Sequence, residues 1–315
     1  MNDRISVVVL THNRLPEVTR TVSHLLSLPE APPVIVADNG STDGTATALR
    51  ERFPDVQVIE CGANLGAAGR NRAAKLARTD YIAFSDDDTE WQPGALDEAV
   101  RILDSAPRVA VISGRVLVGE SRELDPTCAR MRASPLDRAG LPGPALVGYM
   151  AGACVFRAAV FRKVGGYEPR LFIGGEEALV ALDVLDAGHA IVYCDAVVTV
   201  HRPSAARDAP LRRRMLARNA ALVAWLRLPR GEALTASLRA LAALRAGERN
   251  FLRHAAALLR DIGWAMRRRR AVGAAVMRMC EQVRQAELAA FGRREALQRL
   301  RSARRYTLRA SDKRQ

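Results

Sequence analysis

Short apolar runs alternate with longer amphipathic segments along the first two thirds of the chain. The short runs are rich in β-branched residues, which is typical of buried strands, whereas the longer segments repeat apolar residues at helical spacing. The predicted strands are residues 5–10, 33–37, 56–60 and 81–85, and the predicted helices are residues 16–28, 45–52 and 67–78. This alternation predicts an α/β fold with a doubly wound, mostly parallel sheet.

A second block of strands and helices completes this domain. Residues 120–145 are rich in Arg, Pro and Gly and lack periodicity, which predicts a surface loop. The pattern then predicts strands at residues 148–157 and 190–200 and helices at residues 158–164 and 174–187. His201 closes the domain.

Beyond Pro210 the pattern is helical only. The predicted helices are residues 211–226, 234–246, 251–270 and 272–300, followed by a polar tail from Ser302. Leu234, Leu238 and Leu241 recur at helical spacing with Arg between them, which indicates amphipathic helices. We therefore expect an α/β domain at residues 1–203 and an all-helical extension at residues 204–315.

Charge divides close to the same boundary. The 315 residues carry a net charge of +14, but residues 1–201 hold 20 Lys and Arg against 26 Asp and Glu, and the remainder holds 28 against 8. The basicity therefore belongs to the helical extension. A hydrophobic content of 49% is enough for a sizeable core, which argues against disorder.

The sequence favours a cytoplasmic protein. Five cysteines lie far apart without a CxxC pair, which favours reduced thiols over a zinc site or a disulfide framework. The N-terminus runs into an apolar strand without a signal-peptide pattern. The longest uncharged apolar run, residues 145–156, is shorter than the roughly 20 residues of a membrane-spanning helix. If the protein meets a membrane, we expect it to lie on the inner surface.

An acidic triplet, Asp86, Asp87 and Asp88, follows the predicted strand 81–85. The carboxyl ends of the strands form the edge at which open α/β sheets bind ligands. The first and third carboxylates of such a turn point to the same side and can hold a hard divalent cation, which neutralises a diphosphate. The alternative is that Asp86 or Asp88 caps the helix that begins near Pro93.

Two further turns also follow predicted strands. In residues 38–44, Asp38 can accept hydrogen bonds from a nucleobase or ribose, and Ser41 or Asp43 can cap a helix. Residues 61–71 place small residues and Arg70 at a helix start, which suits a phosphate-bearing ligand. The first segment lacks the Gly and Glu of an EF-hand, and the second lacks the second Gly of GxGxxG.

Taken in this order, these segments resemble the inverting glycosyltransferases of family 2, which have the GT-A fold. The likeness lies in residues 7–14 for the opening strand and turn, 38–45 for the DNGSTDGT loop, 64–71 for the NxGxxxxRN segment and 86–88 for the metal-binding DxD. The resemblance covers about residues 4–203. It implies a nucleotide-sugar half at about residues 1–115 and an acceptor half at about residues 116–203.

The resemblance assigns roles to the polar residues at the sheet edge. Asp88 is the first choice as a ligand of Mn²⁺ or Mg²⁺, with Asp86 and His201 beside it. His201 ends the predicted strand 190–200, where a lone His is more often structural, although a neutral imidazole suits both metals. The residues that would contact the nucleotide sugar are Thr11, Asn13, Arg14, Asp38, Asn64, Gly66, Arg70, Asp86 and Asp87.

Glu176 and Glu177 open the predicted helix 174–187. By resemblance, Glu177 is the base that removes the acceptor hydroxyl proton, and Glu176 competes for this role. The alternative is that both only favour the positive end of the helix. The chain departs from the family in having Leu10 where Pro is common, Leu179 where Asp is frequent, and Glu177 in place of a shorter Asp, which leaves the choice of base open.

Acceptor contacts are expected from Trp91, Gly152 and Ala153. Gly152 and Ala153 lie in a segment that resembles the acceptor-side strand of the family. Trp91 follows the acidic triplet and can stack on an acceptor, or it can form a packing staple with Pro93 at a helix start.

The basic helices allow several partners. The Arg runs 212–214 and 267–270 are usually solvated faces in such a setting. The alternatives are adsorption to anionic lipid and oligomerisation through the helices. With 5% aromatic residues and no recognition motif, we do not expect a nucleic-acid partner.

We therefore expect a glycosyltransferase of hexosyl or deoxyhexosyl type that uses a UDP- or dTDP-sugar, inverts the transferred sugar and needs a divalent metal. The expected acceptor is a glycan, a lipid-linked sugar or a small molecule in envelope, exported-polysaccharide or secondary-metabolite synthesis. The alternatives are a non-catalytic sugar-nucleotide or lipid-binding protein and a nucleotidyltransferase, although residues 10–14 lack the Gly-rich loop that a triphosphate requires.

Overall fold

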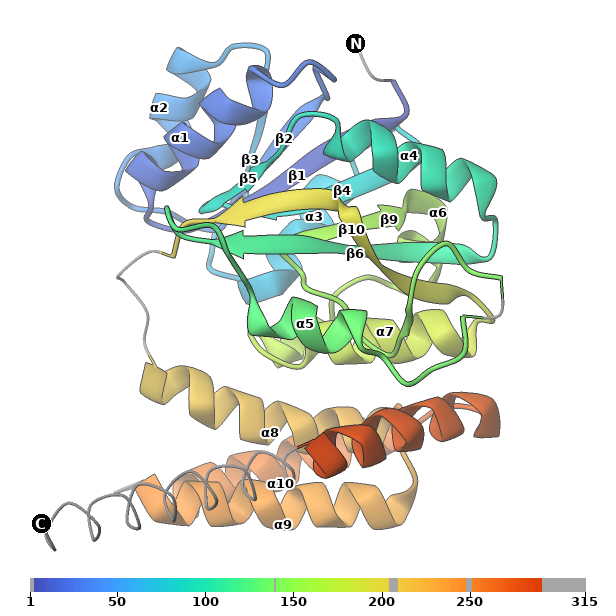
Figure 1. The fold of residues 1–315 in the computed structure, drawn as a ribbon. Helices are drawn as coiled ribbons and strands as arrows, with labels where there is room; N and C mark the ends of the chain where they lie inside the picture. Colours follow the sequence, from blue (N-terminus) through green and yellow to red (C-terminus); the bar gives the residue numbers. More distant parts are fainter. Residues whose placement is uncertain (1–2, 139, 204–208, 248–250, 291–315) are drawn as a thin grey trace, which may run out of the picture.

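The computed structural model describes residues 3–138, 140–203, 209–247 and 251–290, excluding the side chains of residues 209–214 and 246–247. Its centre is one mixed sheet (Figure 1). The strands are β1 (Ile5–Thr11), β2 (Val34–Asp38), β3 (Gln57–Glu60), β4 (Tyr81–Asp86), β5 (Thr89–Trp91), β6 (Val109–Val118), β7 (Glu123–Leu124), β8 (Ala145–Leu146), β9 (Ala153–Arg157) and β10 (Ala190–His201). The main path runs β3-β2-β1-β4-β9-β6-β10-β5, with β7 on β6 and β8 on β10.

Strand direction brings the polar strand ends together. β1 to β4 are mutually parallel where they pair, and β6 pairs parallel with β10, whereas β9 lies antiparallel between β4 and β6. In this register Thr11 lies opposite Asp38, and Leu10 lies opposite Asp86. The carboxyl ends of β1, β2 and β4 therefore share one edge of the sheet.

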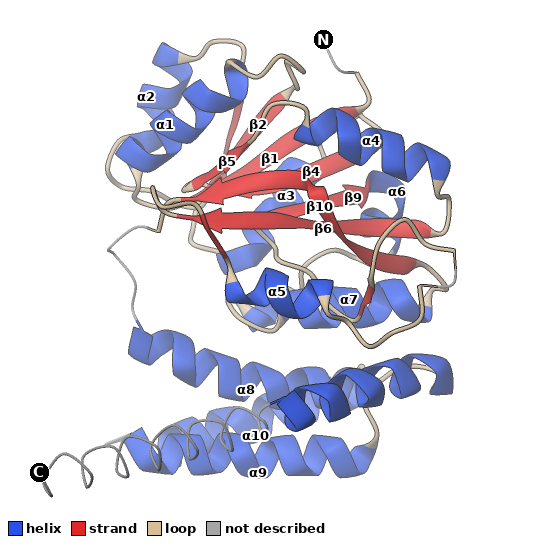
Figure 2. Ribbon diagram, in the orientation of Figure 1, coloured by secondary structure: helices blue, strands red, loops and turns tan. Residues whose placement is uncertain are grey.

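Helices cover both faces of the sheet (Figure 2). They are α1 (Leu15–Leu26), α2 (Thr45–Arg52), α3 (Gly69–Ala74), α4 (Ala95–Ser105), α5 (Pro126–Arg132), α6 (Ala158–Lys163) and α7 (Glu176–Asp186), with short 3-10 turns η1 (Gly66–Ala68) and η2 (Pro169–Leu171). The buried faces of α1, α2 and α4 share one apolar core, and those of α3, α6 and α7 share another. In α1, the buried residues Val18, Val22 and Leu25 follow helical spacing, which explains this division.

The C-terminal helices pack beneath α7 (Figure 1). They are α8 (Ala209–Arg227), α9 (Arg230–Gly247), α10 (Phe251–Arg267) and a further helix at residues 274–290. Leu222 and Val223 of α8 join the core that contains α7. At the far end of α7, the buried Asp183 carboxylate accepts hydrogen bonds from Arg227 Nη2 at 2.9 Å and Arg270 Nη2 at 3.1 Å. The extension is thus joined to the α/β domain by both apolar packing and ion pairs.

The fold confirms the α/β class and the helical extension, with local differences from expectation. The segment predicted as an irregular loop contains α5 and β7, and Asp125 caps α5 by accepting from Thr127 N at 2.7 Å. The ten-residue β6 was not anticipated. Neither Asp86 nor Asp88 caps α4, which begins after Gly94. The predicted tail from Ser302 and the last part of helix 272–300 lie outside the described residues.

The Arg run 267–270 is only partly a solvated face. Arg269 donates to the carbonyl oxygens of Trp225 (2.7 Å) and Leu228 (2.5 Å), while Arg270 pairs with Asp183. The side chains of the other run, residues 212–214, lie outside the described part of the chain. Among the residues that are described, no helix combines the length and apolarity needed to cross a bilayer.

Candidate active site

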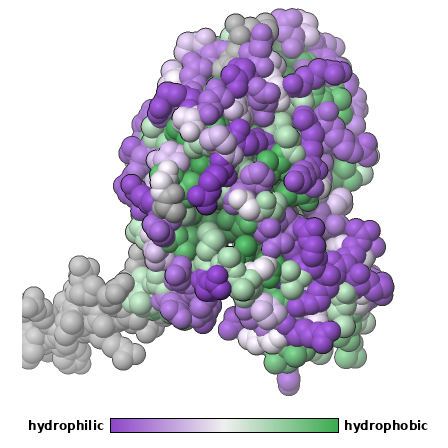
Figure 3. Space-filling model, turned by 90° about the vertical axis from the view of Figure 1, so that its right-hand side faces the viewer, coloured by the Kyte–Doolittle hydropathy of each residue, from purple (hydrophilic) through white to green (hydrophobic). Residues whose placement is uncertain are grey.

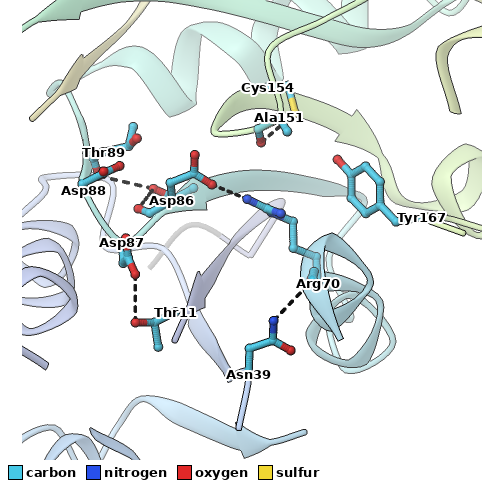
Figure 4. A network of polar contacts seen from close by, with 12 residues as sticks. Thr11, Asn39, Arg70, Asp86, Asp87, Asp88, Thr89, Ala151, Cys154 and Tyr167 are labelled. Atoms are coloured by element: carbon cyan, nitrogen blue, oxygen red, sulfur yellow. Dashed lines mark hydrogen bonds and ion pairs between the residues drawn. The ribbon is translucent and has the colours of Figure 1, made fainter. Parts of the chain in front are cut away.

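The three carboxylates of the acidic triplet point to three different partners. Asp87 Oδ2 accepts from Thr11 Oγ1 at 3.0 Å, and Asp87 Oδ1 accepts from Arg14 Nη1 at 2.9 Å. The Asp87 carbonyl accepts from Thr21 Oγ1 at 2.7 Å. Burial raises the pKa of Asp87 to about 6, an effect that Arg14 opposes. Asp87, Thr11 and Arg14, all predicted to contact the nucleotide sugar, here join the triplet to the end of β1 and the turn after it. Figure 4 shows the bond between Thr11 and Asp87.

Asp88 lies beside His201. His201 Nε2 is 3.4 Å from Asp88 Oδ1, and Arg14 Nη1 is 3.6 Å from Asp88 Oδ2. The arrangement follows from the sheet, because His201 pairs with Thr89 across β10 and β5, and Arg202 N donates to the Asp88 carbonyl at 2.8 Å. The Asp88 carboxylate is the kind of oxygen ligand that Mn²⁺ and Mg²⁺ prefer, and the His201 imidazole beside it could add a nitrogen ligand, with further positions left for diphosphate and water oxygens.

Asp86 is the exception to the predicted metal set. Its carboxylate pairs with the Arg70 guanidinium, and the described residues contain no group of three Asp, Glu, His or Cys side chains gathered as metal ligands. That Asp86 joins Asp88 and His201 on a metal stays a prediction, and in the structure the cation on α3 is its partner. The Asp86 side chain is 42% exposed, so it remains open to a ligand.

Arg70 and Gly152 shape the surroundings of Asp86. The Arg70 side chain is buried, its guanidinium carbon lies 5.9 Å from the centre of the Tyr167 ring, and its Nε has no hydrogen-bond partner within the described structure. A Cβ added at Gly152 would clash with Asp86 Oδ2. Gly152 is thus required for the position of Asp86, which gives the predicted acceptor-side glycine a steric role.

Amide side chains join the loops that follow β1, β2 and β3. Asn13, at φ +51°, accepts from Thr42 N at 2.7 Å, and Asp38 Oδ1 accepts from Ser41 N at 3.2 Å. Asn39, which the sequence analysis did not single out, donates to Asn64 Oδ1 and Gly66 O, both at 3.0 Å. Asn64 and Gly66 therefore hold the loop shape. The available signal for Asn39 was an amide directly after a strand-end carboxylate, which can bond to two loops simultaneously.

The two glutamates at the start of α7 have unequal environments. Glu176 is 4% exposed, and its Oε2 has no hydrogen-bond partner in the part of the chain that is described. Burial, followed by the charge of Glu177, raises the pKa of Glu176 to about 7. Glu177 is half-buried, and its charge acts on Arg70, Tyr167 and Cys154. Glu177 therefore lies near enough to Arg70 for its charge to act on the guanidinium that pairs with Asp86.

The predicted acceptor residues divide into two groups. Trp91 is 0% exposed and packs in the core beneath α1 and α4, while its carbonyl lies 2.6 Å from His24 Nε2. Trp91 thus has no surface on which an acceptor could stack, and the packing alternative applies. Ala153 is also buried and pairs with Ser85 across β9 and β4, which leaves Gly152 as the predicted acceptor residue nearest to Asp86.

The order of these elements matches a known sequence family. Residues 6–165, half of the chain, match the family described as glycosyl transferase family 2. The chain belongs to glycosyl transferase family 2. This family 2 glycosyltransferase is 27% identical over 238 residues to the N-acetylglucosaminyl-diphospho-decaprenol L-rhamnosyltransferase of Mycobacterium tuberculosis, which covers 64% of this chain and 76% of that protein. It is also 27% identical over 206 residues to the pre-mycofactocin glycosyltransferase of the same organism, covering 62% and 42%.

Solved structures place the family 2 glycosyltransferase in the GT-A fold. The mannosyltransferase PcManGT from Pyrobaculum calidifontis, in complex with GDP-Man and Mn²⁺, matches with a TM-score of 0.57 and 21% identity over 90% of this chain and 87% of that chain. S. aureus TarS 1–349 in complex with UDP-GlcNAc matches with a TM-score of 0.57 and 14% identity over 84% and 81%. The expectation of a glycosyltransferase is confirmed, whereas the nucleotidyltransferase and non-catalytic alternatives find no support.

Proposed function

We propose that this glycosyltransferase transfers a sugar from a UDP- or dTDP-sugar to an acceptor hydroxyl, with inversion and with Mn²⁺ or Mg²⁺. The observation that supports this most strongly is the convergence at one sheet edge of the Asp88–His201 pair and the Arg70–Asp86 pair, with Glu177 of α7 near enough for its charge to act on Arg70. In this proposal residues 1–203 carry the transfer reaction, and residues 204–315 form the helical extension.

For the donor, Asp88 and His201 would hold the metal, which supplies positive charge to stabilise the leaving diphosphate. Asp38 ends β2 and Asn13 lies in the turn after β1, and both would contact the base or ribose of the nucleotide. Arg70 is a buried cation beside Asp86 and adds positive charge near the diphosphate. The solved PcManGT complex contains Mn²⁺, which supports a metal in this reaction.

For the transfer step, we assign Glu177 as the base. The acceptor oxygen forms a bond to the anomeric carbon as the bond from that carbon to the diphosphate oxygen breaks. The acceptor proton passes to the Glu177 carboxylate, and the bonding electrons leave with the nucleoside diphosphate. A single displacement of this kind inverts the anomeric centre. Glu176 is buried and retains a proton more readily, so it is the poorer base near neutral pH.

For the acceptor, we propose a lipid-linked sugar. The M. tuberculosis relative is named for a diphospho-decaprenol acceptor. A groove of about 750 Å³ lies between α5 and the helix at residues 274–290, with Met131, Leu146, Val283 and Leu288 in its walls. Ser113 Oγ donates to Met131 Sδ in the groove wall at 3.5 Å and accepts from Met150 N at 3.2 Å. Met150 lies two residues before Gly152, so these bonds connect the groove to the segment beside Asp86. An apolar tail would fit this groove.

The surface of α10 supports docking on anionic lipid. Leu252 (80% exposed), Leu259 and Met266 recur every seven residues and so form one stripe, next to the exposed Arg253, Arg260 and Arg267. On the face seen in Figure 3, hydrophobic residues are interspersed among hydrophilic ones. We propose peripheral binding to the inner membrane face through the α10 stripe, meaning these three apolar residues.

A donor-turnover assay tests the central proposal. Purified protein is incubated with UDP-GlcNAc, UDP-glucose, GDP-mannose or dTDP-L-rhamnose and a prenyl-diphosphate-linked GlcNAc, with Mn²⁺ or EDTA, and free nucleoside diphosphate is followed. We expect metal-dependent release with one UDP- or dTDP-sugar. Release that survives Asp88→Ala would remove the metal assignment. Release that survives both Glu177→Ala and Glu176→Ala would remove the base, and no release with any donor would reject the proposed function.

A further inference from the structure

The loop between η2 and α7 leads directly into Glu176 and Glu177. One side of this loop contacts η1. Phe172 has a φ of +59°, a left-handed conformation that is rare for a bulky residue. Its carbonyl accepts from Ala67 N at 2.7 Å, and a Cβ at Gly66 would clash with the same carbonyl. The loop is therefore fitted against η1, directly before the helix that contains Arg70.

The other side of this loop is held by Asn219 of α8. Asn219 is 0% exposed, and its Nδ2 lies 2.6 Å from Leu171 O, 3.1 Å from Ile173 O and 2.6 Å from Gly174 O. The two amide hydrogens are thus shared among three carbonyls. Asn219 Oδ1 accepts from Arg218 Nη1 at 2.6 Å, which fixes which end of the amide faces the loop.

The approach of α8 to the loop depends on two glycines. Gly174 and Gly175 have φ values of +84° and +95°. A Cβ at Gly175 would lie 3.1 Å from Asn219 Cβ, and one at Gly174 would lie 2.8 Å from Leu216 Cδ2. Because Gly175 is also the N-cap of α7, α8 contacts the backbone directly before Glu176.

We propose that Asn219 is a positioning residue for sugar transfer, and that the helical extension is therefore part of the catalytic apparatus. By binding the carbonyls of the loop, Asn219 sets where α7 begins and hence where Glu177 lies. The inference rests on the proposed function, because it takes Glu177 as the base. Asn13, Asp38, Asp88 and His201, which would hold the nucleotide and the metal, lie on other elements, so loss of Asn219 affects the rate of transfer more than donor binding.

The test compares Asn219→Asp and Asn219→Ala with Ser237→Ala. Asn219→Asp keeps the shape of the side chain but replaces its hydrogen-bond-donating NH2 group by a carboxylate oxygen. That oxygen can only accept hydrogen bonds, and it would lie against three carbonyl oxygens. Ser237 is a matched control, since it is buried in the same helical extension and bonds to Trp225 Nε1 (2.9 Å) and Ala233 O (2.8 Å) but not to the loop. Leu216→Ala is a second variant of α8 at the contact with Gly174 of the loop. The Leu216 side chain is 44% exposed, so the fold should tolerate its truncation.

We expect both Asn219 variants to lower kcat by about 10- to 100-fold, because a small misplacement of a reacting group has an effect of this order. The donor KM should stay within about threefold, as expected for loss of an interaction that does not bind the donor. Leu216→Ala should lower kcat less, and Ser237→Ala should leave it unchanged. Hydrogen–deuterium exchange should rise at residues 66–68 and 171–180 in the Asn219 variants and, to a smaller extent, in Leu216→Ala, but not in Ser237→Ala.

Two results would overturn the inference: a kcat within twofold of wild type in both Asn219 variants, or an equal loss of kcat in Ser237→Ala. If the Asn219 variants do not fold, Leu216→Ala decides, and an unchanged kcat with unchanged exchange rejects the inference. Hydrogen–deuterium exchange is measured without substrate, so it tests the positioning role of Asn219 independently of the proposed transfer activity. A wild-type protein without transfer activity rejects the proposed function, whereas active variants that match wild type reject the positioning role alone.

Discussion

His201 Nε2 lies 3.4 Å from Asp88 Oδ1, although the two residues are 113 positions apart in sequence. The pairing of β10 with β5 produces this proximity, because it places His201 opposite Thr89, the residue after Asp88. The last strand of the α/β domain therefore completes a site that begins at the carboxyl end of β4.

Removing either member of this pair should weaken metal binding. We expect His201→Ala to raise the Mn²⁺ concentration for half-maximal transfer by at least about 10-fold, since even partners outside the coordination shell contribute that much. Asp88→Asn should have a larger effect, because it also removes a negative charge from the site. The measurement is the rate of transfer against Mn²⁺ concentration. His189→Ala is the control, since His189 directly precedes the opposite end of β10 and should behave as wild type.

The buried Glu176 should make stability fall as pH rises. Its carboxyl has an ordinary pKa of 4.5 and a folded pKa of about 7. Between these values the unfolded chain releases the proton and the folded chain keeps it, so the free energy of unfolding decreases with rising pH. Below pH 4.5 both states are protonated and the full stabilisation is present.

Urea unfolding of wild type and Glu176→Gln at pH 5 and pH 8 measures this effect. The free energy of unfolding of the Gln variant, relative to wild type, should be higher at pH 8 than at pH 5, because the variant carries no ionisable proton at this position. An equal difference at pH 5 and pH 8 would show that Glu176 does not titrate in this range.

Gly152→Ala should impair catalysis without unfolding the protein. The added methyl group meets Asp86 Oδ2 and must displace the carboxylate that pairs with Arg70. We expect kcat/KM for the donor to fall by about 10-fold or more, as for other small displacements in an active site. Gly231→Ala is a matched control, because it lies in α9 and a Cβ there meets nothing within 4 Å. Equal activity of both variants would argue against a steric role for Gly152.

Trp91 should matter for stability and not for the acceptor. Trp91→Ala should lower the free energy of unfolding by about 3–5 kcal/mol, as expected for truncation of a fully buried aromatic side chain. Trp91→Phe should keep the acceptor KM of wild type. A raised acceptor KM at unchanged thermal stability would instead return Trp91 to the acceptor site.

The α10 stripe should be required for binding to lipid vesicles. Replacing Leu252, Leu259 and Met266 together by Ser should abolish co-sedimentation with vesicles that contain phosphatidylglycerol. A control double variant, Leu26→Ser with Leu76→Ser, changes leucines of the α/β domain that are 42% and 41% exposed and should bind as wild type. High salt should weaken the wild-type interaction, because it screens the Arg side chains. Unchanged sedimentation of the triple variant would reject the stripe as the docking surface.

The sequence was most informative where local pattern and strand order coincide. The strands that end at Thr11, Asp38 and Asp86 were predicted within one residue, since apolar runs lead directly into polar turns. The ten residues of β6 were not anticipated because Gly114 and Arg115 interrupt the apolar sequence pattern of this strand. Gly114 is needed because a Cβ there would lie 2.7 Å from Val197 O, a long-range constraint that local periodicity does not reveal.

Side-chain direction was harder to predict than strand position. Asp86, Asp87 and Asp88 are adjacent in sequence, yet Arg70, Thr11 and His201 come from distant segments and draw each carboxylate a different way. Trp91 was ambiguous because a tryptophan after a turn suits both a ligand site and a core. Asn219 could not be found from sequence, since a single polar residue in an amphipathic helix does not reveal which loop lies against it.

The register shift in β10 between Cys194 and Val198 has a consequence for how the chain can vary. Side chains alternate along a strand, so one residue gained or lost between Val198 and His201 would exchange the directions of Val200 and His201. At residues 195–197 the strand already departs from regular pairing with β6, and a change in length can be absorbed there. Insertions and deletions in homologous chains should therefore concentrate at the bulge. The number of residues from Val198 to His201 should stay constant, because it keeps the His201 side chain on the side of the strand that faces Asp88.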